Sequence, residues 1–161
     1  GAKNAQLTIL VGGQREDFDA CQDVFTALGN KIVYTGPSGS GQQTKLANQV
    51  AIAGAIAGVC EAIAFAQKVG LDPVQTLDAI SSGAAGSFQM ASNGPKILQG
   101  DFTPGFYIKH YVKDMMLAQD ELGKKDAALK VLDDVLDMYR ELEQRGLGDE
   151  GTQALIKYYQ N

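Results

Sequence analysis

The stretch from residue 36 to residue 69 constrains the fold of this 161-residue chain more than any other part. It opens with the glycine-rich turn Gly36-Pro37-Ser38-Gly39-Ser40-Gly41 and then runs to Gly70 without a proline. This pattern predicts one helix from about Ser40 to Val69, about 45 Å long at the usual rise per residue. Residues 51–58 are small or isoleucine, so we expect the middle of the helix to pack among other helices or against a second subunit.

Composition narrows the class of protein. A hydrophobic content of 45% with 20% charged residues is typical of a soluble globular domain with a real core. A net charge of −5 with no block of Lys or Arg argues against nucleic acid and acidic membrane surfaces as partners. The most apolar run, residues 50–60, is shorter than the roughly 20 residues of a membrane span.

The chain shows no signal-peptide pattern. Its two cysteines, Cys21 and Cys60, do not make a disulfide framework, which favours a reducing, cytoplasmic compartment. The chain begins without an initiator Met and passes almost at once into a predicted strand. We therefore expect the natural protein to start further upstream.

The first 35 residues are predicted to form a strand, a helix and a second strand, at residues 7–11, 15–28 and 31–34. Two strands alone do not make a stable sheet. This segment is therefore either the edge of a larger α/β sheet or a small appendage on the helical part.

Beyond the long helix the sequence predicts only helices, each opened or closed by Asp, Gly or Pro. They are expected at residues 72–81, at 88–98 with a break at Gly94-Pro95, at 108–122, at 126–145, and in a short last helix from Asp149 or Gly151. The helix over 126–145 has an apolar stripe at Leu129, Leu132, Leu136, Tyr139 and Leu142. The predicted fold is mainly α, with one unit at 1–35 and a helical unit at 36–161.

The glycine-rich turn first suggests a phosphate-binding loop, but neither common motif fits. The P-loop pattern needs Lys-Ser/Thr after its last glycine, and here Gly41 is followed by two glutamines. The dinucleotide fingerprint has the order G-x-G-x-x-G, and here the order is inverted.

Lys45 is the strongest candidate for chemistry. It lies one turn into the long helix, and Asn48 and Gln49 follow at i+3 and i+4 on the same face. The positive end of the helix dipole disfavours a charged lysine there, which suits a general acid/base. The alternative is an ordinary solvated lysine. The single histidine, His110, and the pair Lys113-Asp114 are weaker candidates, and no metal site is predicted.

Three ordered motifs resemble those of the β-hydroxyacid dehydrogenases, which include 3-hydroxyisobutyrate dehydrogenase and tartronate semialdehyde (2-hydroxy-3-oxopropionate) reductase. They are the strand and turn of residues 7–13, the helix start Lys45-Leu46-Ala47-Asn48-Gln49, and the segment 102–106 followed by Val112-Lys113-Asp114. The resemblance covers nearly the whole chain. It implies an all-helical C-terminal domain like that of 6-phosphogluconate dehydrogenase, with a long central helix, preceded by the strand–helix–strand remnant of a Rossmann-type sheet.

The resemblance also implies an activity, the interconversion of a small β-hydroxy acid and its semialdehyde with NAD or NADP. Lys45 would exchange the hydroxyl proton, Gly41 with Asn48 or Gln49 would bind the substrate, and the segment of Phe106, Lys113 and Asp114 would contact the cofactor. Most of the cofactor would be bound by an N-terminal domain that this chain lacks, so we expect residues 1–161 alone to be inactive.

Family members associate through this domain, so the resemblance implies a homodimer or homotetramer. Two alternatives stay open at this point. One is a non-catalytic helical dimerisation module, favoured by the long Gly/Ala-rich helix. The other is a dehydrogenase of a phosphorylated sugar acid, for which few basic residues lie near Lys45 and Lys113 in the sequence.

Overall fold

The computed structural model describes residues 6–160. It divides into two compact units, Gly1–Asn48 and Gln49–Asn161. The division falls inside the long helix α3, Ser40–Lys68, whereas the sequence places the domain boundary at residues 35–36. The first five residues of the predicted N-terminal unit lie outside the described residues, and that boundary stays a prediction.

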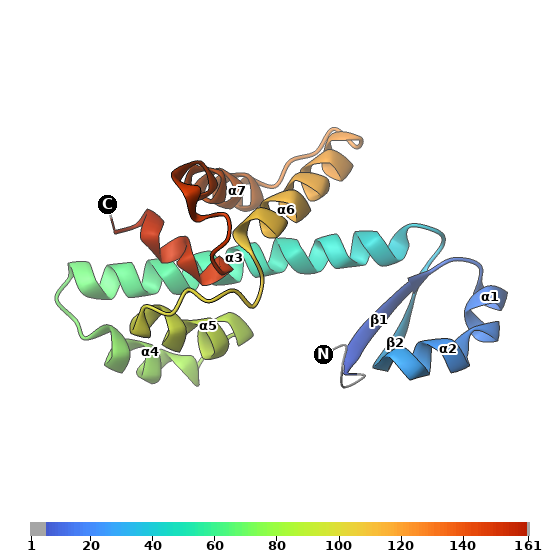
Figure 1. The fold of residues 1–161 in the computed structure, drawn as a ribbon, viewed down its shortest axis with the longest axis horizontal. Helices are drawn as coiled ribbons and strands as arrows, with labels where there is room; N and C mark the ends of the chain where they lie inside the picture. The colour runs from blue at the N-terminus through green and yellow to red at the C-terminus, as the bar shows by residue number, and fades with distance from the viewer. Residues whose placement is uncertain (1–5, 161) are drawn as a thin grey trace. The chain divides into compact units, whose positions relative to one another are not determined.

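The first unit is built on a two-stranded parallel sheet. β1 (Leu7–Gly12) is joined to β2 (Gly29–Gly36) by α1 (Arg15–Ala20) and α2 (Gln22–Leu28), and Figure 1 shows these helices beside the strands. Both predicted strands are therefore present. The single helix predicted over 15–28 is wrong, because the backbone leaves the helical region at Cys21, with φ −101° and ψ 10°.

The second unit is organised around α3. Its buried side chains form much of the core, namely Ala53, Ile56, Ala57, Val59, Cys60, Ile63, Ala64 and Ala66. Within this unit Figure 1 shows the α4–α5 pair on one side of α3 and the α6–α7 pair on the other. By length and composition α3 could cross a membrane, but half of its most apolar stretch is buried, as in a core helix.

The α4–α5 pair covers one side of α3. α4 (Pro73–Ser81) begins as predicted, because the Asp72 carboxylate accepts hydrogen bonds from the backbone N–H groups of Val74 and Gln75. α5 (Phe88–Gln99) is continuous through Gly94 and Pro95, so the predicted break is wrong. Gly94 is buried against α4, and this packing keeps a proline-containing helix intact.

The α6–α7 pair covers the other side of α3. α6 (Ile108–Gly123) matches its prediction, but α7 (Lys130–Leu142) starts later than residue 126. Asp126 adopts a left-handed conformation (φ 53°), and the Ala127 N–H bonds back to the Leu122 carbonyl. This closure ends α6 and uses the residues that were expected to begin the next helix.

Within the stripe predicted for α7, the first leucine is exposed and the other four residues are buried. α7 is followed by a turn at Glu143–Leu147, where Gly146 leaves the helical region with φ 82°, and by a final 3₁₀ helix labelled η3, Thr152–Tyr158. The predicted short last helix is thus present. The mainly α fold with a long central helix is confirmed.

Candidate active site

The glycine-rich turn joins β2 to α3 by close backbone packing. Gly36 and Gly39 have φ values of 121° and 91°, which favour glycine. A Cβ on Gly41 would lie 2.8 Å from the carbonyl oxygen of Leu10. The side chain of Ser40 accepts or donates a hydrogen bond with Thr35 (3.1 Å) and donates one to the carbonyl of Pro37 (2.6 Å). The start of α3 is therefore fixed to the end of β1.

This packing bears on Gly41, which was predicted to bind substrate. The residue is buried, and its α-carbon faces the backbone of β1. Its visible role is to let the helix approach the strand. A substrate contact at Gly41 stays a prediction.

Lys45 and Asn48 lie on the exposed side of the first turns of α3. The next residue, Gln49, has the opposite environment and is only 2% exposed. Its side-chain Nε2 donates a hydrogen bond to Oδ2 of Asp114 at 2.9 Å. Each residue of a helix turns by about 100°, so neighbours in sequence can face different surroundings. The structure thus separates two amides that the sequence offers as equivalent candidates.

Asp114 links Gln49 to Lys113. Its second oxygen, Oδ1, lies 3.1 Å from the Lys113 ammonium nitrogen. The Asp114 side chain is 15% exposed and that of Lys113 is 64% exposed. The carboxylate therefore lies between a buried amide and a solvent-facing cation. Lys113 keeps donors that can bind an anionic group.

Tyr111 is a member of this cluster that the sequence did not suggest. Its hydroxyl donates a hydrogen bond of 2.8 Å to the backbone carbonyl of Gln49. The side chain is fully buried and its ring meets that of Tyr139 edge-on, with centroids 5.3 Å apart. Burial raises the pKa of Tyr111, and the neighbouring Asp114 adds to the effect, so the hydroxyl stays a donor. Its position three residues before Asp114 was the available signal.

Phe106, predicted to contact the cofactor, lies just before α6 and is 38% exposed. That ring meets Tyr111 edge-on at a centroid distance of 5.9 Å. The Phe106 carbonyl accepts a hydrogen bond from the backbone N–H of Thr152. The segment that contains Phe106 is thus tied to the C-terminal part of the unit.

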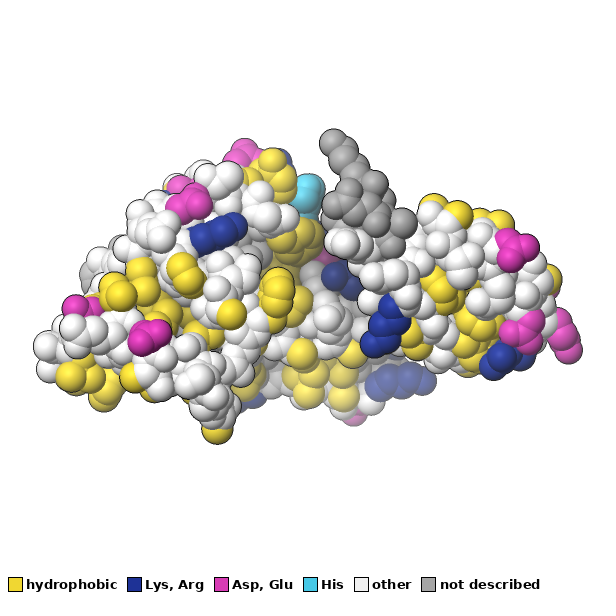
Figure 2. Space-filling model, turned by 90° about the horizontal axis from the view of Figure 1, so that it is seen from below, with side chains coloured by type: hydrophobic (Ala, Val, Ile, Leu, Met, Phe, Trp, Pro, Cys, Tyr) yellow, Lys and Arg dark blue, Asp and Glu magenta, His cyan; other side chains and the backbone are white. Residues whose placement is uncertain are grey.

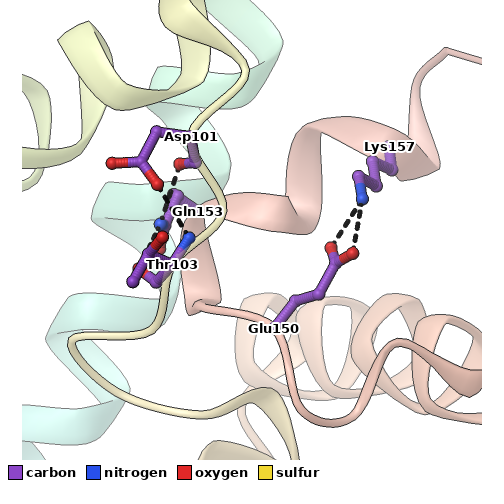
Figure 3. Close-up of polar contacts among 5 residues, drawn as sticks. All are labelled: Asp101, Thr103, Glu150, Gln153 and Lys157. Carbon is purple, nitrogen blue, oxygen red and sulfur yellow. Dashed lines mark hydrogen bonds and ion pairs between the residues drawn. The ribbon is translucent and has the colours of Figure 1, made fainter.

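The loop before Phe106 is held by a second buried amide that the sequence did not reveal. Gln153 is 1% exposed, and its Nε2 donates hydrogen bonds to the carbonyls of Asp101 (3.1 Å) and Thr103 (3.0 Å), as Figure 3 shows. The Thr103 N–H bonds to the Asp101 side chain and lowers the pKa of that carboxyl. Close by, the Lys157 ammonium contacts both oxygens of Glu150. The hydrogen bonds of Gln153 hold the loop that leads into α6 in one conformation.

His110 lies on α6 beside the rings of Phe106 and Tyr107, with centroids 6.4 and 5.5 Å away. Within residues 6–160, no group of three or more His, Cys, Asp or Glu side chains is arranged to hold a metal ion.

A cavity of about 520 Å³ lies apart from these residues, between α4 and α5. It is lined largely by apolar side chains, including Val74, Leu77, Met90 and Leu98. Figure 2 shows the face that these two helices cover, where hydrophobic side chains lie among polar and a few charged ones. The cavity contains no lysine and none of the predicted site residues.

The comparison with known protein families gives two matches that together cover most of the chain. Residues 39–159 match the family described as the NAD-binding domain of NADP-dependent 3-hydroxyisobutyrate dehydrogenase. Residues 1–36 match the NAD binding domain of 6-phosphogluconate dehydrogenase.

Individual relatives agree with these matches. An uncharacterised oxidoreductase of Bacillus subtilis is 45% identical over 159 residues, which are 99% of this chain and 55% of the relative. A probable mitochondrial 3-hydroxyisobutyrate dehydrogenase-like protein of Arabidopsis thaliana is 42% identical over 97% of this chain and 46% of its own length.

Among solved structures, the 3-hydroxyisobutyrate dehydrogenase of Mycobacterium tuberculosis with L-serine superposes with a TM-score of 0.92 at 25% identity. The match covers 99% of this chain and 57% of that one. The chain thus spans about half the length of the proteins it matches.

Proposed function

Since the chain belongs to the family of NADP-dependent 3-hydroxyisobutyrate dehydrogenases, we propose that the longer protein containing it oxidises a small β-hydroxy acid to its semialdehyde and catalyses the reverse reduction. The names of the two family matches support NAD or NADP as cofactor. The M. tuberculosis relative was solved with L-serine, which is itself a β-hydroxy acid. Both 3-hydroxyisobutyrate and 2-hydroxy-3-oxopropionate types of substrate fit this class.

The observation that carries the proposal is the environment of Lys45. The residue is exposed one turn into α3, directly after a turn whose close packing fixes the start of that helix. Asn48 is exposed on the same helix, three residues later. A lysine and an amide in this arrangement can share one bound hydroxyl group, the lysine exchanging its proton and the amide orienting it.

Lys45 is the general acid/base in this proposal. In the oxidation, the Lys45 Nζ in its amine form accepts the proton of the substrate hydroxyl. The hydrogen on the carbon that carries this hydroxyl leaves with its electron pair, as a hydride. A bound oxidised nicotinamide would accept that hydride. In the reduction, a bound reduced nicotinamide would supply the hydride to the carbonyl carbon, and the Lys45 ammonium would return the proton to the oxygen of the semialdehyde.

The residues on α6 fit an anionic dinucleotide. Lys113 presents a largely exposed ammonium group, and Phe106 presents part of its ring a few residues earlier. A phosphate can accept hydrogen bonds from the lysine, and an aromatic ring can pack against a base or nicotinamide. Asp114 would orient Lys113 without approaching the phosphate itself.

Replacement of Lys45 tests the role directly. In the full-length protein, Lys45→Ala should lower kcat by roughly 10²–10⁴, because no other group would exchange the proton. Steady-state kinetics would be measured with a panel of β-hydroxy acids and both cofactors, including a phosphorylated sugar acid.

Lys68→Ala is the matched control, since Lys68 lies in the last turn of the same helix. This variant should keep the kcat of the wild type. A Lys45→Ala enzyme with a kcat near the wild-type value would reject the proposed role.

One surface favours a second property, association of subunits through the helical unit. Ala51, Gly58 and Phe65 are spaced by seven residues on one exposed face of α3, and Phe65 is 64% exposed. The exposed Glu61 lies between Gly58 and Phe65 on α3, and the small and aromatic residues beside it suit close packing with the same face of a second copy. We propose a homodimer or a higher homo-oligomer built on this face.

A further inference from the structure

We propose that Gln49 is a positioning residue, which holds Asp114 so that Asp114 fixes the ammonium group of Lys113. The binding of the substrate hydroxyl or carboxylate is then left to Asn48. This inference rests on the proposed function, because it assigns roles to residues that the proposed reaction already uses. It gives the side-chain amides of Asn48 and Gln49 different roles, whereas the sequence offers both as substrate ligands.

Gln49 and Lys113 contact different oxygens of the same carboxylate, that of Asp114. Oδ2 of Asp114 accepts the hydrogen bond of the Gln49 amide at 2.9 Å, and Oδ1 contacts the Lys113 ammonium at 3.1 Å. A carboxylate held at one oxygen loses rotational freedom at the other. By orienting the Asp114 carboxylate through Oδ2, Gln49 therefore also sets the position of Oδ1, which contacts the Lys113 ammonium group.

The second support is that Gln49 is itself held at two points. Its backbone carbonyl accepts the hydroxyl hydrogen bond of Tyr111, and its side chain donates to Asp114. Tyr111 and Asp114 are three residues apart on α6 and so face α3 together. A residue fixed at both backbone and side chain gives a rigid reference for its neighbours.

The burial of Gln49 argues against a role in binding the substrate. Gln49 is 2% exposed, so a ligand could reach its amide only after displacing the Asp114 hydrogen bond. The Asp114 carboxylate would then repel the carboxylate of a hydroxy acid at close range. Asn48 is exposed and lies on the side of α3 that also exposes Lys45.

The length of the side chain also matters. Glutamine differs from asparagine by one methylene, and its removal would draw the amide back by about 1.5 Å. A hydrogen bond of 2.9 Å does not survive that retreat without movement of α3 or α6. Leucine keeps nearly the same volume but cannot donate.

The test uses the full-length protein and two readouts. The first is the dissociation constant of NAD or NADP, measured by titration without substrate. The second is the rate at which acetic anhydride labels Lys113, measured by peptide mass spectrometry with Lys68 as internal reference. The variants are Gln49→Leu, Asn48→Ala, and the pair Gln49→Glu and Asp114→Asn, alone and combined.

We expect Gln49→Leu to weaken cofactor binding by about tenfold, the factor that one hydrogen bond to a charged group supplies. Labelling of Lys113 should accelerate, that of Lys68 should not change, and the KM of the hydroxy acid at saturating cofactor should stay near its wild-type value. Asn48→Ala should raise that KM and leave the cofactor constant unchanged.

The combined Gln49→Glu/Asp114→Asn variant exchanges the acceptor and the donor and keeps one hydrogen bond between the two positions. It should recover cofactor affinity relative to Gln49→Glu alone, which places two carboxylates together. Such a recovery of cofactor affinity would show that the loss in Gln49→Glu does not come from poor folding.

Two results would overturn the proposal. One is a Gln49→Leu enzyme with a raised hydroxy-acid KM and unchanged cofactor affinity, which would make Gln49 a substrate ligand. The other is unchanged labelling of Lys113. If labelling changes while neither wild type nor variant binds NAD or NADP, the positioning role stands and the proposed function fails.

Discussion

At the scale of single residues, environment rather than type decides the task. Lys45 and Lys113 are both exposed lysines on helices, and the Lys113 ammonium lies 3.1 Å from Oδ1 of Asp114. Asn48 and Gln49 carry the same functional group, and one is exposed while the other is buried. Local sequence presents the two amides as equivalent, and the contact of Gln49 with Asp114 of α6 distinguishes them.

The environment of Cys60 also affects the stability of the folded chain. Burial in the core raises the pKa of its thiol from 9.0 to about 12, with the charge of Glu61 adding to the effect. The folded chain therefore keeps the proton that the unfolded chain loses. This contribution is complete below pH 9 and is lost as the pH rises toward 12.

We predict that the free energy of unfolding falls between pH 9 and pH 10 by as much as about 1.4 kcal/mol because of this thiol. Cys60→Ala should flatten the decline, since Tyr111, Tyr139 and Tyr159 contribute mainly above pH 10. Urea unfolding at several pH values measures the slope. Equal slopes in the wild type and in Cys60→Ala would contradict the prediction.

At the scale of elements, α5 shows how packing outweighs a local signal. Proline in a helix interior removes one hydrogen bond and crowds the preceding turn. The helix nevertheless continues to Gln99, because Gly94 allows it to approach Leu77 of α4 closely. A Cβ on Gly94 would lie 2.7 Å from the Leu77 Cδ2 atom.

Gly94→Ala should therefore destabilise the chain by roughly 1–3 kcal/mol, despite the better helix propensity of alanine. Gly54→Ala is the comparison, since its Cβ would meet only Val131 Cγ1 at an ordinary 3.8 Å. That variant should be neutral or more stable by up to about 1 kcal/mol. Thermal and urea unfolding measure both.

The added cost of Gly94→Ala should disappear in a Leu77→Ala background, where the clashing atom is gone. If the cost persists there, the close approach of the two helices is not its cause.

At the scale of the whole molecule, the exposed apolar residues at the end of α3 belong to the face that we propose for contact between copies of the protein. Phe65, near the C-terminal end of the helix, is 64% exposed, and Val69, which directly follows the helix, is 54% exposed. Phe65→Glu would place an unpaired charge in the proposed contact. Its dissociation constant for self-association, measured by sedimentation velocity on the full-length protein, should rise by at least roughly tenfold.

Phe88→Glu serves as the control, because Phe88 is 79% exposed but lies at the start of α5. Its self-association should match the wild type. A Phe65→Glu protein that associates like the wild type would exclude this face of α3 as the contact.

The sequence by itself determined the elements whose signals are local. The long helix follows from an unbroken run of small and apolar residues, and the start of α4 follows from Asp72 and Pro73. The motifs around Lys45 and Lys113 likewise indicated the family before any contact was known. Capping, periodicity and turn chemistry act over a few residues and can be read along the chain.

Only the tertiary structure decided the features that depend on distant partners. These include the continuity of α5, the late start of α7, and the burial of Gln49 against Asp114, which lies 65 residues away in the sequence. Gln153 gave no signal beyond being polar in an apolar segment, since its partners are two backbone carbonyls. The free energy of such contacts comes from burial and long-range hydrogen bonds, which local sequence does not encode.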